Sequence, residues 1–495
     1  MIMYKDIDAT GIRDTMERSS EAFIIYGEST LTERAAFMKR IAQGLQAAAD
    51  TIVPVAMRES HLPEARLRNE LGRTIFQLNS YADAADAGRW LEVSIDTADP
   101  VRTPPKADIR KTMSPLGPVV VFGSSNFPFA YSTAGGDTAS AFAAGCTVVV
   151  KAHPAHSETS TMVAAVIDEA VKACGLPEGT FQHVHGASFE VGRALVSDKN
   201  TKAVGFTGSF SGGKALFDWA AQREEPIPVF AEMGSTNPVF LLPEKLAADA
   251  AGLAKQLAGS LTLGVGQFCT KPGLIIAIAG SSLDTFVDTL KMEINKVVPA
   301  EMLHEGIVRA YGEKRNKALA RSGVTLISES EQPAQGLQGR PTVAIVKASD
   351  FLKDTVLHQE VFGPWSLIVA CADAEEMTLV AASLEGQLTA SLMATEGDVR
   401  EHPLLVSTAK SKCGRFIYNG VPTGVEVCQA MHHGGPYPST TDSRYSSVGA
   451  DAIKRFARPV SYQNWPDALL PEELRNANPL GIWRTVNNEL TKASL

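Results

Sequence analysis

The chain has 495 residues, of which 44% are hydrophobic and 20% charged, with 40 glycines and 27 prolines. At roughly 150 residues per domain this length predicts two or three domains, and the composition excludes a disordered, collagen-like or low-complexity chain. The formal net charge of −9 has the wrong sign for a protein whose main partner is nucleic acid.

The amino-terminal residues show no basic segment followed by an apolar stretch, and no run reaches about 18 uninterrupted apolar residues. A secretory leader and a membrane span are therefore not expected, and the sequence predicts a cytoplasmic protein. Six cysteines are far too few for a disulfide scaffold, and no two of them form a Cys-x-x-Cys pair. Free thiols are predicted, so one of the cysteines can serve as a catalytic nucleophile.

The first hundred residues have the pattern of helices. Thr30 and Glu33 form a capping box, and Phe37 and Ile41 belong to an apolar stripe that recurs every four residues. A second helix is predicted from a second stripe, made of Leu67, Leu71, Ile75 and Leu78. Residues 98–115 are polar, rich in proline and without helical periodicity, so they form either a linker or an extended arm.

From residue 117 the pattern changes to short runs of Val, Ile and Phe, separated by segments of helical length. Strands are predicted at 118–122, 146–150, 181–185, 203–206 and 229–233. Helices are predicted near 135–145, 157–173, 188–197 and 210–221. This alternation is typical of βαβ units with a mostly parallel sheet covered by helices on both faces. Ligands of such sheets bind beyond the carboxyl ends of the strands, where reactive side chains are expected.

A second α/β series begins near residue 237. Its strands are predicted at 238–242, 274–278, 343–346, 365–370 and 389–393, and its helices near 245–263, 282–297 and 301–320. Two α/β domains that share a cleft form the simplest architecture. The last part of the chain, from about residue 436, is irregular and contains proline. It is expected to wrap over earlier parts of the chain or over a neighbouring subunit.

The most informative segment for chemistry is residues 264–273, Gly-Val-Gly-Gln-Phe-Cys-Thr-Lys-Pro-Gly. It presents Cys269 in a loop whose glycines let the backbone approach a ligand closely. A thiol in such a loop can be partly exposed and act as a nucleophile. A structural cysteine is normally buried inside a helix or strand, as expected of Cys146 and Cys371. Cys269 is therefore the candidate nucleophile, with a buried structural thiol as the alternative.

Two polar residues follow predicted strands of the first series. Glu232 lies at the end of an apolar run, where a carboxylate is costly to bury unless it is partnered or kept near neutrality for proton transfer. A salt-bridged or helix-capping glutamate is the alternative. Asn126 lies just past the strand 118–122, where its amide can donate to a developing oxyanion or form an Asx-turn before Pro128.

Other positions near strand ends suit a phosphate-bearing ligand. Lys151 closes a strand, where it holds a ribose or a phosphate or is merely solvated. The turn 207–213, Thr-Gly-Ser-Phe-Ser-Gly-Gly, precedes a helix and offers backbone N–H groups to an anion, although it is not a G-x-G-x-x-G sequence. For Glu360, a capping or turn role is the alternative to ligand binding. His432 and His433 are adjacent, so their side chains diverge, and with no Cys or His at ligand spacing no metal site is expected.

Six short segments occur in an order that resembles the aldehyde dehydrogenase superfamily. They are Ser-Asn-Phe-Pro (125–128), Val-Val-Val-Lys (148–151), Gly-Phe-Thr-Gly-Ser (205–209), Glu-Met-Gly (232–234), Gly-Gln-Phe-Cys-Thr (266–270) and Glu-Val-Phe-Gly-Pro (360–364). The resemblance extends over most of the chain. Longer stretches at 122–130, 134–140, 151–156 and 266–273 are similar to the branch of α-ketoglutaric semialdehyde (2,5-dioxopentanoate) dehydrogenases, and to a related NADP-dependent fatty aldehyde dehydrogenase.

The resemblance implies a role for each matching residue. Cys269 attacks the aldehyde carbon, Asn126 and the Cys269 backbone N–H hold the oxyanion, and Glu232 activates the water that hydrolyses the thioester. Cofactor binding is implied for Lys151, Pro154, Gly208, Ser209, Glu360 and Phe362, with Lys151 and Glu360 at the two riboses and Ser209 at the pyrophosphate. A substrate pocket is implied at Phe127, Tyr131 and Phe268.

The resemblance also implies NAD or NADP as the cofactor and no metal. NAD-specific members often have Glu three residues after the lysine that stands here as Lys151, but this chain has Pro154. A glutamate would repel a 2′-phosphate, so its absence admits NADP and leaves the preference open.

An α/β fold with a Rossmann-like cofactor domain, an α/β catalytic domain and an oligomerisation arm follows from the same resemblance. The cofactor domain is expected at 1–97 and 118–234 with part of 433–460, and the catalytic domain at 235–432. The arm is expected at 98–117 with about 461–495. Such arms pair strands between subunits, so a homodimer or homotetramer is expected.

The expected reaction is oxidation of 2,5-dioxopentanoate to 2-oxoglutarate through a cysteine thioester. The alternative substrate is a medium- or long-chain fatty aldehyde, because the implied pocket residues are apolar or aromatic and no cation for a substrate carboxylate can be named. A non-catalytic relative is disfavoured, because Cys269, Glu232 and Asn126 are all present.

Overall fold

Three long helices open the chain in the structure, a computed structural model that describes residues 4–495. They are α1 (Ala9–Tyr26), α2 (Leu31–Ser60) and α3 (Glu64–Ala87). The predicted capping box of α2 is confirmed, because the Glu33 N–H donates to Thr30 Oγ1 at 3.1 Å and the Thr30 N–H donates to Glu33 Oε2 at 2.8 Å. The predicted apolar stripes of α2 and α3 are largely buried.

Five parallel strands form the first sheet, in the order β5–β4–β3–β6–β7. They are β3 (Val119–Phe122), β4 (Val148–Lys151), β5 (Phe181–Val184), β6 (Ala203–Thr207) and β7 (Val229–Glu232). The helices that connect them are α4 (Gly136–Ala144), α5 (Ser157–Ala173), α6 (Phe189–Ser197) and α7 (Phe210–Ala221). The predicted alternation is confirmed, with β4 beginning two residues later than expected. The strand order reverses between β3 and β6, which is where sheets of this kind bind ligands.

Alternate side chains of these strands pack against opposite helical layers. Val120, Val149 and Val204 belong to one apolar core with α1, α6 and α7, whereas Val119 and Val148 belong to a second core with α2 to α5. Because successive strand residues face opposite sides of a sheet, both faces are covered. The continuous apolar runs in the sequence have this physical cause.

Seven strands form the second sheet, in the order β11–β13–β14–β9–β8–β15–β16, and all neighbours are parallel except β11 and β13. The strands are β8 (Val239–Leu241), β9 (Leu274–Ile278), β11 (Thr325–Glu329), β13 (Thr342–Lys347), β14 (Trp365–Cys371), β15 (Gln387–Met393) and β16 (Cys413–Tyr418). The five predicted strands are confirmed. The two edge strands, β11 and β16, were not predicted, because they are only partly buried and lack a continuous apolar run.

Helices cover both faces of the second sheet. One face carries α8 (Pro243–Thr262) and α9 (Ser281–Lys296), and the other carries α10 (Glu305–Leu319), α12 (Ala374–Ser383) and α14 (Pro403–Ser411). Two short helices, α11 (Ala348–Phe351) and α13 (Glu396–Glu401), complete this unit. The predicted helix 301–320 was wrong at its start, because Ala300–Glu301 forms strand β10, which pairs with β12 (Gln338–Gly339).

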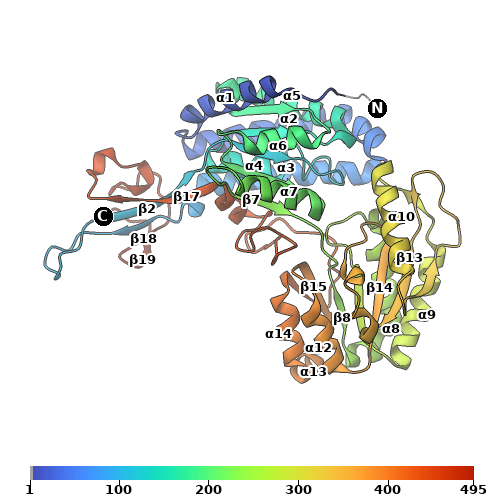
Figure 1. Ribbon diagram of the computed structural model, residues 1–495. Coiled ribbons are helices and arrows are strands. Elements are labelled where there is room, and N and C mark those ends of the chain that lie inside the picture. The colour runs from blue at the N-terminus through green and yellow to red at the C-terminus, as the bar shows by residue number, and fades with distance from the viewer. Residues whose placement is uncertain (1–3) are drawn as a thin grey trace.

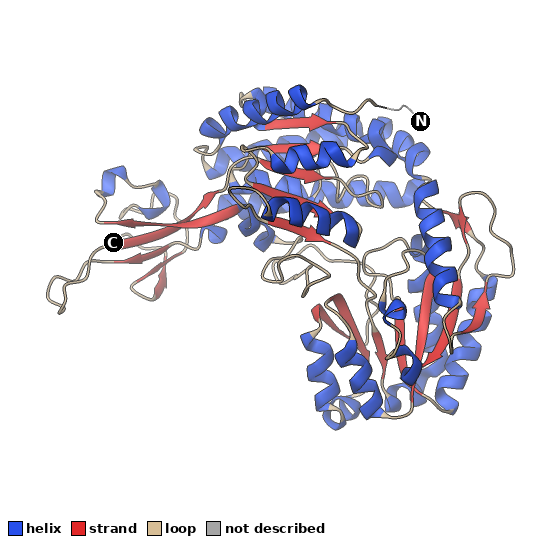
Figure 2. Cartoon of the chain, viewed as in Figure 1, coloured by secondary structure: helices blue, strands red, loops and turns tan. Residues whose placement is uncertain are grey.

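A third sheet projects away from both units (Figures 1 and 2). Its order is β17–β2–β1–β18–β19, built from β1 (Ser94–Asp96), β2 (Ile109–Pro115), β17 (Ala457–Gln463), β18 (Arg484–Val486) and β19 (Glu489–Thr491). Antiparallel pairing of β2 with β17 shows that the proline-rich stretch leads into an extended arm. The carboxyl-terminal segment therefore wraps back over earlier parts of the chain, which is the first of the two arrangements expected from the sequence.

The segment between β16 and β17 returns to the first sheet and crosses the end of β7. The Met233 N–H donates to the carbonyl oxygen of Ser439 at 2.8 Å, and Glu232 forms a β-bridge with Thr440. This crossing brings His433 next to the carboxyl end of the sheet. Within residues 4–495, none of the helices combines the length and the apolarity that crossing a bilayer requires.

Candidate active site

A cavity of about 800 Å³ lies between the carboxyl ends of the first sheet and the second α/β unit. Its wall contains seven of the residues that the sequence singled out: Asn126, Gly208, Ser209, Glu232, Cys269, Glu360 and Phe362. Lys151 and Pro154 adjoin this wall through His153, which is part of it. The structure thus brings together residues that are far apart in the sequence.

The loop before Cys269 has an unusual backbone. Gly264, Val265 and Gly266 are three consecutive left-handed residues, with φ of 54°, 58° and 64°. A Cβ on Gly266 would lie 2.3 Å from the carbonyl oxygen of Gly363, so glycine is required there. A β-branched residue such as Val265 rarely adopts this conformation, which stores strain on the order of 1–3 kcal/mol beside the thiol.

Asn237 holds the other side of this loop. Its buried side-chain Nδ2 donates to the carbonyl oxygens of Cys269 at 2.8 Å and Lys271 at 3.0 Å. Gln387 Oε1 in turn accepts from the Asn237 N–H at 3.1 Å. Sequence reasoning missed both residues, because a lone Asn before proline indicates only a turn.

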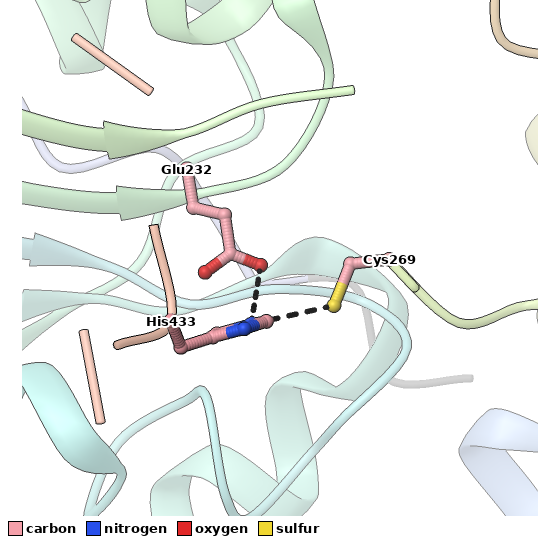
Figure 3. Close-up of side chains that lie close together, drawn as sticks. All are labelled: Glu232, Cys269 and His433. Atoms are coloured by element: carbon pink, nitrogen blue, oxygen red, sulfur yellow. Dashed lines mark hydrogen bonds and ion pairs between the residues drawn. The ribbon is translucent and has the colours of Figure 1, made fainter. Parts of the chain in front are cut away.

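His433 lies between Glu232 and Cys269 (Figure 3). Its Nε2 is 3.1 Å from Glu232 Oε1 and 3.7 Å from Cys269 Sγ, and Ser447 Oγ donates to Glu232 Oε2 at 3.0 Å. No Cys or His stands at ligand spacing from His433 along the sequence, but the fold brings Cys269, 164 residues away, to within 3.7 Å of it. Glu, Cys and His donor atoms within 4.8 Å also resemble a zinc donor set, so the argument from spacing against a metal does not hold.

The electrostatics of this group favour a charged carboxylate beside a protonated thiol. Burial raises the pKa of the Cys269 thiol well above its ordinary value, and the charge of Glu232 raises it further, against the opposing charge of Arg73. Burial also works against the charge of Glu232, but His433 and hydrogen bonds from Cys269 and Ser447 outweigh it and lower its pKa. Attack by the sulfur therefore needs a base. Glu232 is partnered, which is one of the two conditions for burial that the sequence analysis set out.

Asn126 is buried directly beside the thiol loop. Its side-chain Nδ2 donates to the backbone carbonyl oxygen of Gln267 at 3.2 Å. The backbone carbonyl oxygen of Asn126 accepts from Arg66 Nη2 at 2.9 Å. The amide is therefore fixed close to Cys269 and has a second N–H available, as an oxyanion donor requires.

The first turn of α7 lines one side of the cavity. Ser209 caps this helix, with its Oγ accepting from the Gly212 N–H at 3.2 Å. The helix N-terminus directs further N–H groups towards an anion. A Cβ on Gly208 would lie 2.6 Å from the Phe206 ring, which accounts for a glycine before the cap.

Glu360 enters the cavity from the second unit. A Cβ on Gly234 would lie 2.7 Å from Glu360 Oε2, so the glycine leaves room for this carboxylate. Burial raises the pKa of Glu360, while the positive charge of Lys271 opposes the rise. Lys271 is itself buried, and its Nζ donates to the carbonyl oxygens of Val361 at 3.1 Å and Trp365 at 2.7 Å.

The three predicted substrate residues form one aromatic cluster. The Phe127 ring centroid lies 5.3 Å from that of Tyr131 and 5.5 Å from that of Phe268. Val427 and Val448 join the same apolar core. Since the Tyr131 ring is also 6.4 Å from the His433 ring, the cluster reaches the reactive group.

Two arginines of α3 lie on these rings. Arg66 Cζ is 5.2 Å from the Phe127 centroid and 4.7 Å from the Phe268 centroid, and Arg73 Cζ is 5.4 Å from the Tyr131 centroid. All three distances are typical of cation–π contacts. Sequence reasoning missed these residues because α3 reads only as an amphipathic helix.

A cavity of about 800 Å³ between two α/β units, with a thiol, a carboxylate and an amide in its wall, contains the groups that covalent oxidation of an aldehyde through a thioester requires. The chain belongs to the aldehyde dehydrogenase family, whose sequence model matches residues 1–459. The resemblance found in the sequence is thereby confirmed. Members of this family use NAD or NADP.

Two named relatives are similar over nearly their whole length. The chain is 48% identical to α-ketoglutaric semialdehyde dehydrogenase 2 of Azospirillum brasilense, over 94% of this chain and 89% of the relative. It is 43% identical to an α-ketoglutaric semialdehyde dehydrogenase of Acinetobacter baylyi, over 95% and 90%.

Solved structures support the fold. Betaine aldehyde dehydrogenase of Staphylococcus aureus superposes with a TM-score of 0.79 over 94% of this chain and 89% of that one, at 18% identity. Glyceraldehyde-3-phosphate dehydrogenase of Methanocaldococcus jannaschii, complexed with NADP, superposes with a TM-score of 0.77. The superposition covers 93% of this chain and 95% of that one, also at 18% identity. The predicted α/β fold is confirmed.

Proposed function

We propose that this aldehyde dehydrogenase oxidises 2,5-dioxopentanoate to 2-oxoglutarate through a thioester on Cys269. The observation that carries the proposal is the near full-length similarity to two relatives named for this semialdehyde. The site supports it, because Cys269, Glu232 and Asn126 meet at one end of the cavity.

A nicotinamide dinucleotide fits the residues of the cavity. Ser209 and the amides of α7 would hold the pyrophosphate, Glu360 the nicotinamide ribose and Lys151 the adenosine ribose, with Gly208 and Phe362 lining the site. When bound, the nicotinamide accepts the hydride that leaves the aldehyde carbon. Glu360 is part of the cavity wall, which places its carboxylate within reach of a ligand.

The attacking sulfur loses its proton to a water molecule in the cavity, which carries it to solvent. His433 does not take this proton, because its Nε2–H already donates to Glu232 Oε1 at 3.1 Å and holds the carboxylate charged. A C–S bond forms as the carbonyl π bond breaks, which leaves negative charge on oxygen. The Asn126 side chain and the Cys269 backbone N–H donate to that oxygen and stabilise it.

Glu232 acts in the second half of the reaction. Once the aldehyde carbon has lost its hydride, the acyl group remains on Cys269 as a thioester. Glu232 takes a proton from a water molecule whose oxygen attacks the thioester carbonyl. The C–S bond then breaks, the sulfur leaves with its electron pair, and the carboxylic acid is released.

The competing substrate is a medium- or long-chain aldehyde, which the aromatic cluster at Phe127, Tyr131 and Phe268 would suit. The named relatives do not favour it. A non-catalytic protein is disfavoured by the complete set of reactive groups in contact.

The substrate assignment predicts a preference for the carboxylate. The kcat/KM for 2,5-dioxopentanoate should exceed that for pentanal by at least about tenfold, since a charged hydrogen bond is worth roughly 1.5–3 kcal/mol. The measurement is reduced nicotinamide absorbance with both substrates and with alkanals from butanal to decanal. A fatty aldehyde enzyme would instead gain roughly 0.8 kcal/mol per buried methylene. A steady climb with chain length and no carboxylate advantage would overturn the assignment.

We also propose that the adenosine site tolerates the 2′-phosphate of NADP. Pro154 is exposed beside the cavity-lining His153, and burial lowers the pKa of nearby Lys151 to about 8. Replacing Pro154 with Glu should raise the KM of NADP more than that of NAD, by about fivefold, because like-charge repulsion at this range is on the order of 1 kcal/mol. Steady-state kinetics with both cofactors measure this. Equal effects on the two would place the adenosine ribose elsewhere.

The domain division, assembly and location remain part of the proposal. We propose a cofactor domain at 1–97 and 118–234 with part of 433–460, a catalytic domain at 235–432 and an arm at 98–117 with about 461–495. The arm leaves the edge strand β19 and Leu490, 69% exposed, available to a second subunit. A cytoplasmic homodimer or homotetramer is the proposed form, which light scattering would measure.

A further inference from the structure

Arg73 lies on the substrate side of the reactive group. Its Nη2 donates to the Tyr131 hydroxyl at 3.1 Å, and the Tyr131 ring lies 6.4 Å from His433, whose Nε2 is 3.7 Å from Cys269 Sγ. The wall of the 800 Å³ cavity, as far as the described chain forms it, includes Cys269 but neither Arg73 nor Tyr131. Arg73 therefore approaches the thiol from the aromatic cluster and not from the cofactor cavity.

Arg73 retains donors for a ligand. Its Nε is buried and has no hydrogen-bond partner among residues 4–495. A buried donor that stays unpaired is costly, so such groups indicate a missing partner. Burial works against its charge, but Tyr131, Cys269 and Glu70 outweigh it and raise its pKa, so the side chain is a cation.

Glu70, the acidic residue nearest to Arg73 along α3, forms no hydrogen bond with the Arg73 guanidinium among residues 4–495. Glu70 Oε1 accepts from the Phe129 N–H at 2.8 Å and the Ala130 N–H at 3.0 Å, which fixes α3 against this segment. Burial raises the pKa of Glu70 to about 7, so it is only partly charged at neutral pH. Arg66 lies two turns earlier on the same face of α3, so the local charge is positive.

Two other arginines near the site donate to backbone carbonyl oxygens, although each also has one buried nitrogen without a partner among residues 4–495, Nη1 of Arg66 and Nε of Arg415. Arg66 is placed between the rings of Phe127 and Phe268, and its Nη2 donates to the Asn126 carbonyl oxygen. Both terminal nitrogens of Arg415 donate to carbonyl oxygens, those of Gly424 and Pro422. The charge of Arg73 works to lower the pKa of Cys269, and the thiol in turn works to raise the pKa of both Arg73 and Arg415. Among residues 4–495, Arg73 differs from the other two because it donates to a side-chain hydroxyl and to no backbone carbonyl oxygen.

We propose that Arg73 is the residue that binds the carboxylate of the substrate. The inference rests on the proposed function, which requires an ω-aldehyde with a carboxylate at the other end. Four C–C bonds of about 1.5 Å place that carboxylate roughly 5 Å from the aldehyde carbon in an extended chain. A short anionic aldehyde bound to Cys269 thus extends past His433 and Tyr131 towards the guanidinium, whose planar donors match a carboxylate.

The test compares one anionic and one neutral substrate in matched variants. Arg73→Met should lower kcat/KM for 2,5-dioxopentanoate by roughly a hundredfold, mainly through KM, because a charged hydrogen bond in a buried site is lost. The kcat/KM for pentanal should change less than about threefold, which also shows that the variant is folded. Arg73→Lys should restore part of the loss. Arg68→Met, on the exposed side of the same helix where Arg68 pairs with Glu64 and Asp50, should change neither substrate.

A binding measurement gives a second readout. With pentanal as substrate, 2-oxoglutarate should inhibit the wild type competitively and the Arg73→Met variant much more weakly. Equal losses for both substrates would show that Arg73 only supports Tyr131, and an unchanged preference for 2,5-dioxopentanoate would place the carboxylate elsewhere. Either result overturns the inference and leaves the proposed function standing. A wild type without that preference would overturn both.

Discussion

Replacing Cys269 with Ala should reduce aldehyde oxidation to a trace. The proposed thioester needs this sulfur, which His433 contacts at 3.7 Å and which Asn237 positions through the Cys269 carbonyl oxygen. Loss of a covalent nucleophile lowers kcat by a factor on the order of 10⁴ or more. Reduced nicotinamide formed from 2,5-dioxopentanoate measures the effect.

An exposed thiol provides the matched control. Cys174 is exposed at the end of α5, so Cys174→Ala should keep full activity. A Cys269→Ala enzyme that still turned over at more than a trace would rule out the covalent mechanism. Circular dichroism of both variants separates loss of chemistry from loss of fold.

Replacing Glu232 with Gln should separate the two halves of the reaction. The Glu232 carboxylate raises the pKa of the Cys269 thiol, so neutralising it lowers that pKa and favours the reactive thiolate. With the lower pKa, the thiol can lose its proton to water before it attacks. The first turnover should therefore survive as a burst of reduced nicotinamide, while steady turnover falls by roughly 10²- to 10⁴-fold for want of a base for water.

Rapid mixing over one turnover measures this burst. Its amplitude should approach one reduced nicotinamide per active site. If the burst disappeared together with turnover, Glu232 would act on the thiol through His433 and not on water alone. Ser447→Ala, which removes hydrogen bonds to Glu232 Oε2 and to the His433 carbonyl oxygen but keeps the carboxylate, is a suitable control and should lower steady turnover modestly while the burst remains.

Much of the fold follows from the sequence, because the buried parallel strands are continuous apolar runs. Runs such as 118–122 and 274–278 are buried on both faces by helices, and the observed strands β3 and β9 match them. The edge strands could not be predicted in this way. Strand β16 is half-exposed along most of its length and so has no distinct apolar run.

The reactive residues were predictable where they lie in short local motifs. Asn126 lies in the loop after strand β3, and Cys269 lies in the glycine-rich loop after helix α8. Both loops can be recognised in the sequence, and both residues line the cavity. His433 and Asn237 were not predictable, because their contacts depend on segments that meet only in the folded chain. His433 reaches Cys269 because residues 433–447 return across the end of β7.

The cation near the substrate pocket was hidden for a similar reason. In the sequence Arg73 is one of several charged residues on an amphipathic helix. Its distinction from Arg68 is three-dimensional: Arg68 forms ion pairs with Glu64 and Asp50 at the surface, whereas Arg73 packs on Tyr131 with a buried Nε. The periodicity of apolar residues predicts which face of α3 is buried, but it does not predict that Arg73 on this helix packs against Tyr131.

The most direct measurement is to trap the acyl intermediate and locate it. The Glu232→Gln enzyme is mixed with 2,5-dioxopentanoate and cofactor, quenched in acid, digested and analysed by mass spectrometry. We expect a mass gain of one 2-oxoglutaryl group on the peptide that contains Cys269, in proportion to the reduced nicotinamide formed. Reduced nicotinamide without that adduct, or the adduct on another cysteine, would contradict oxidation of this semialdehyde through a Cys269 thioester.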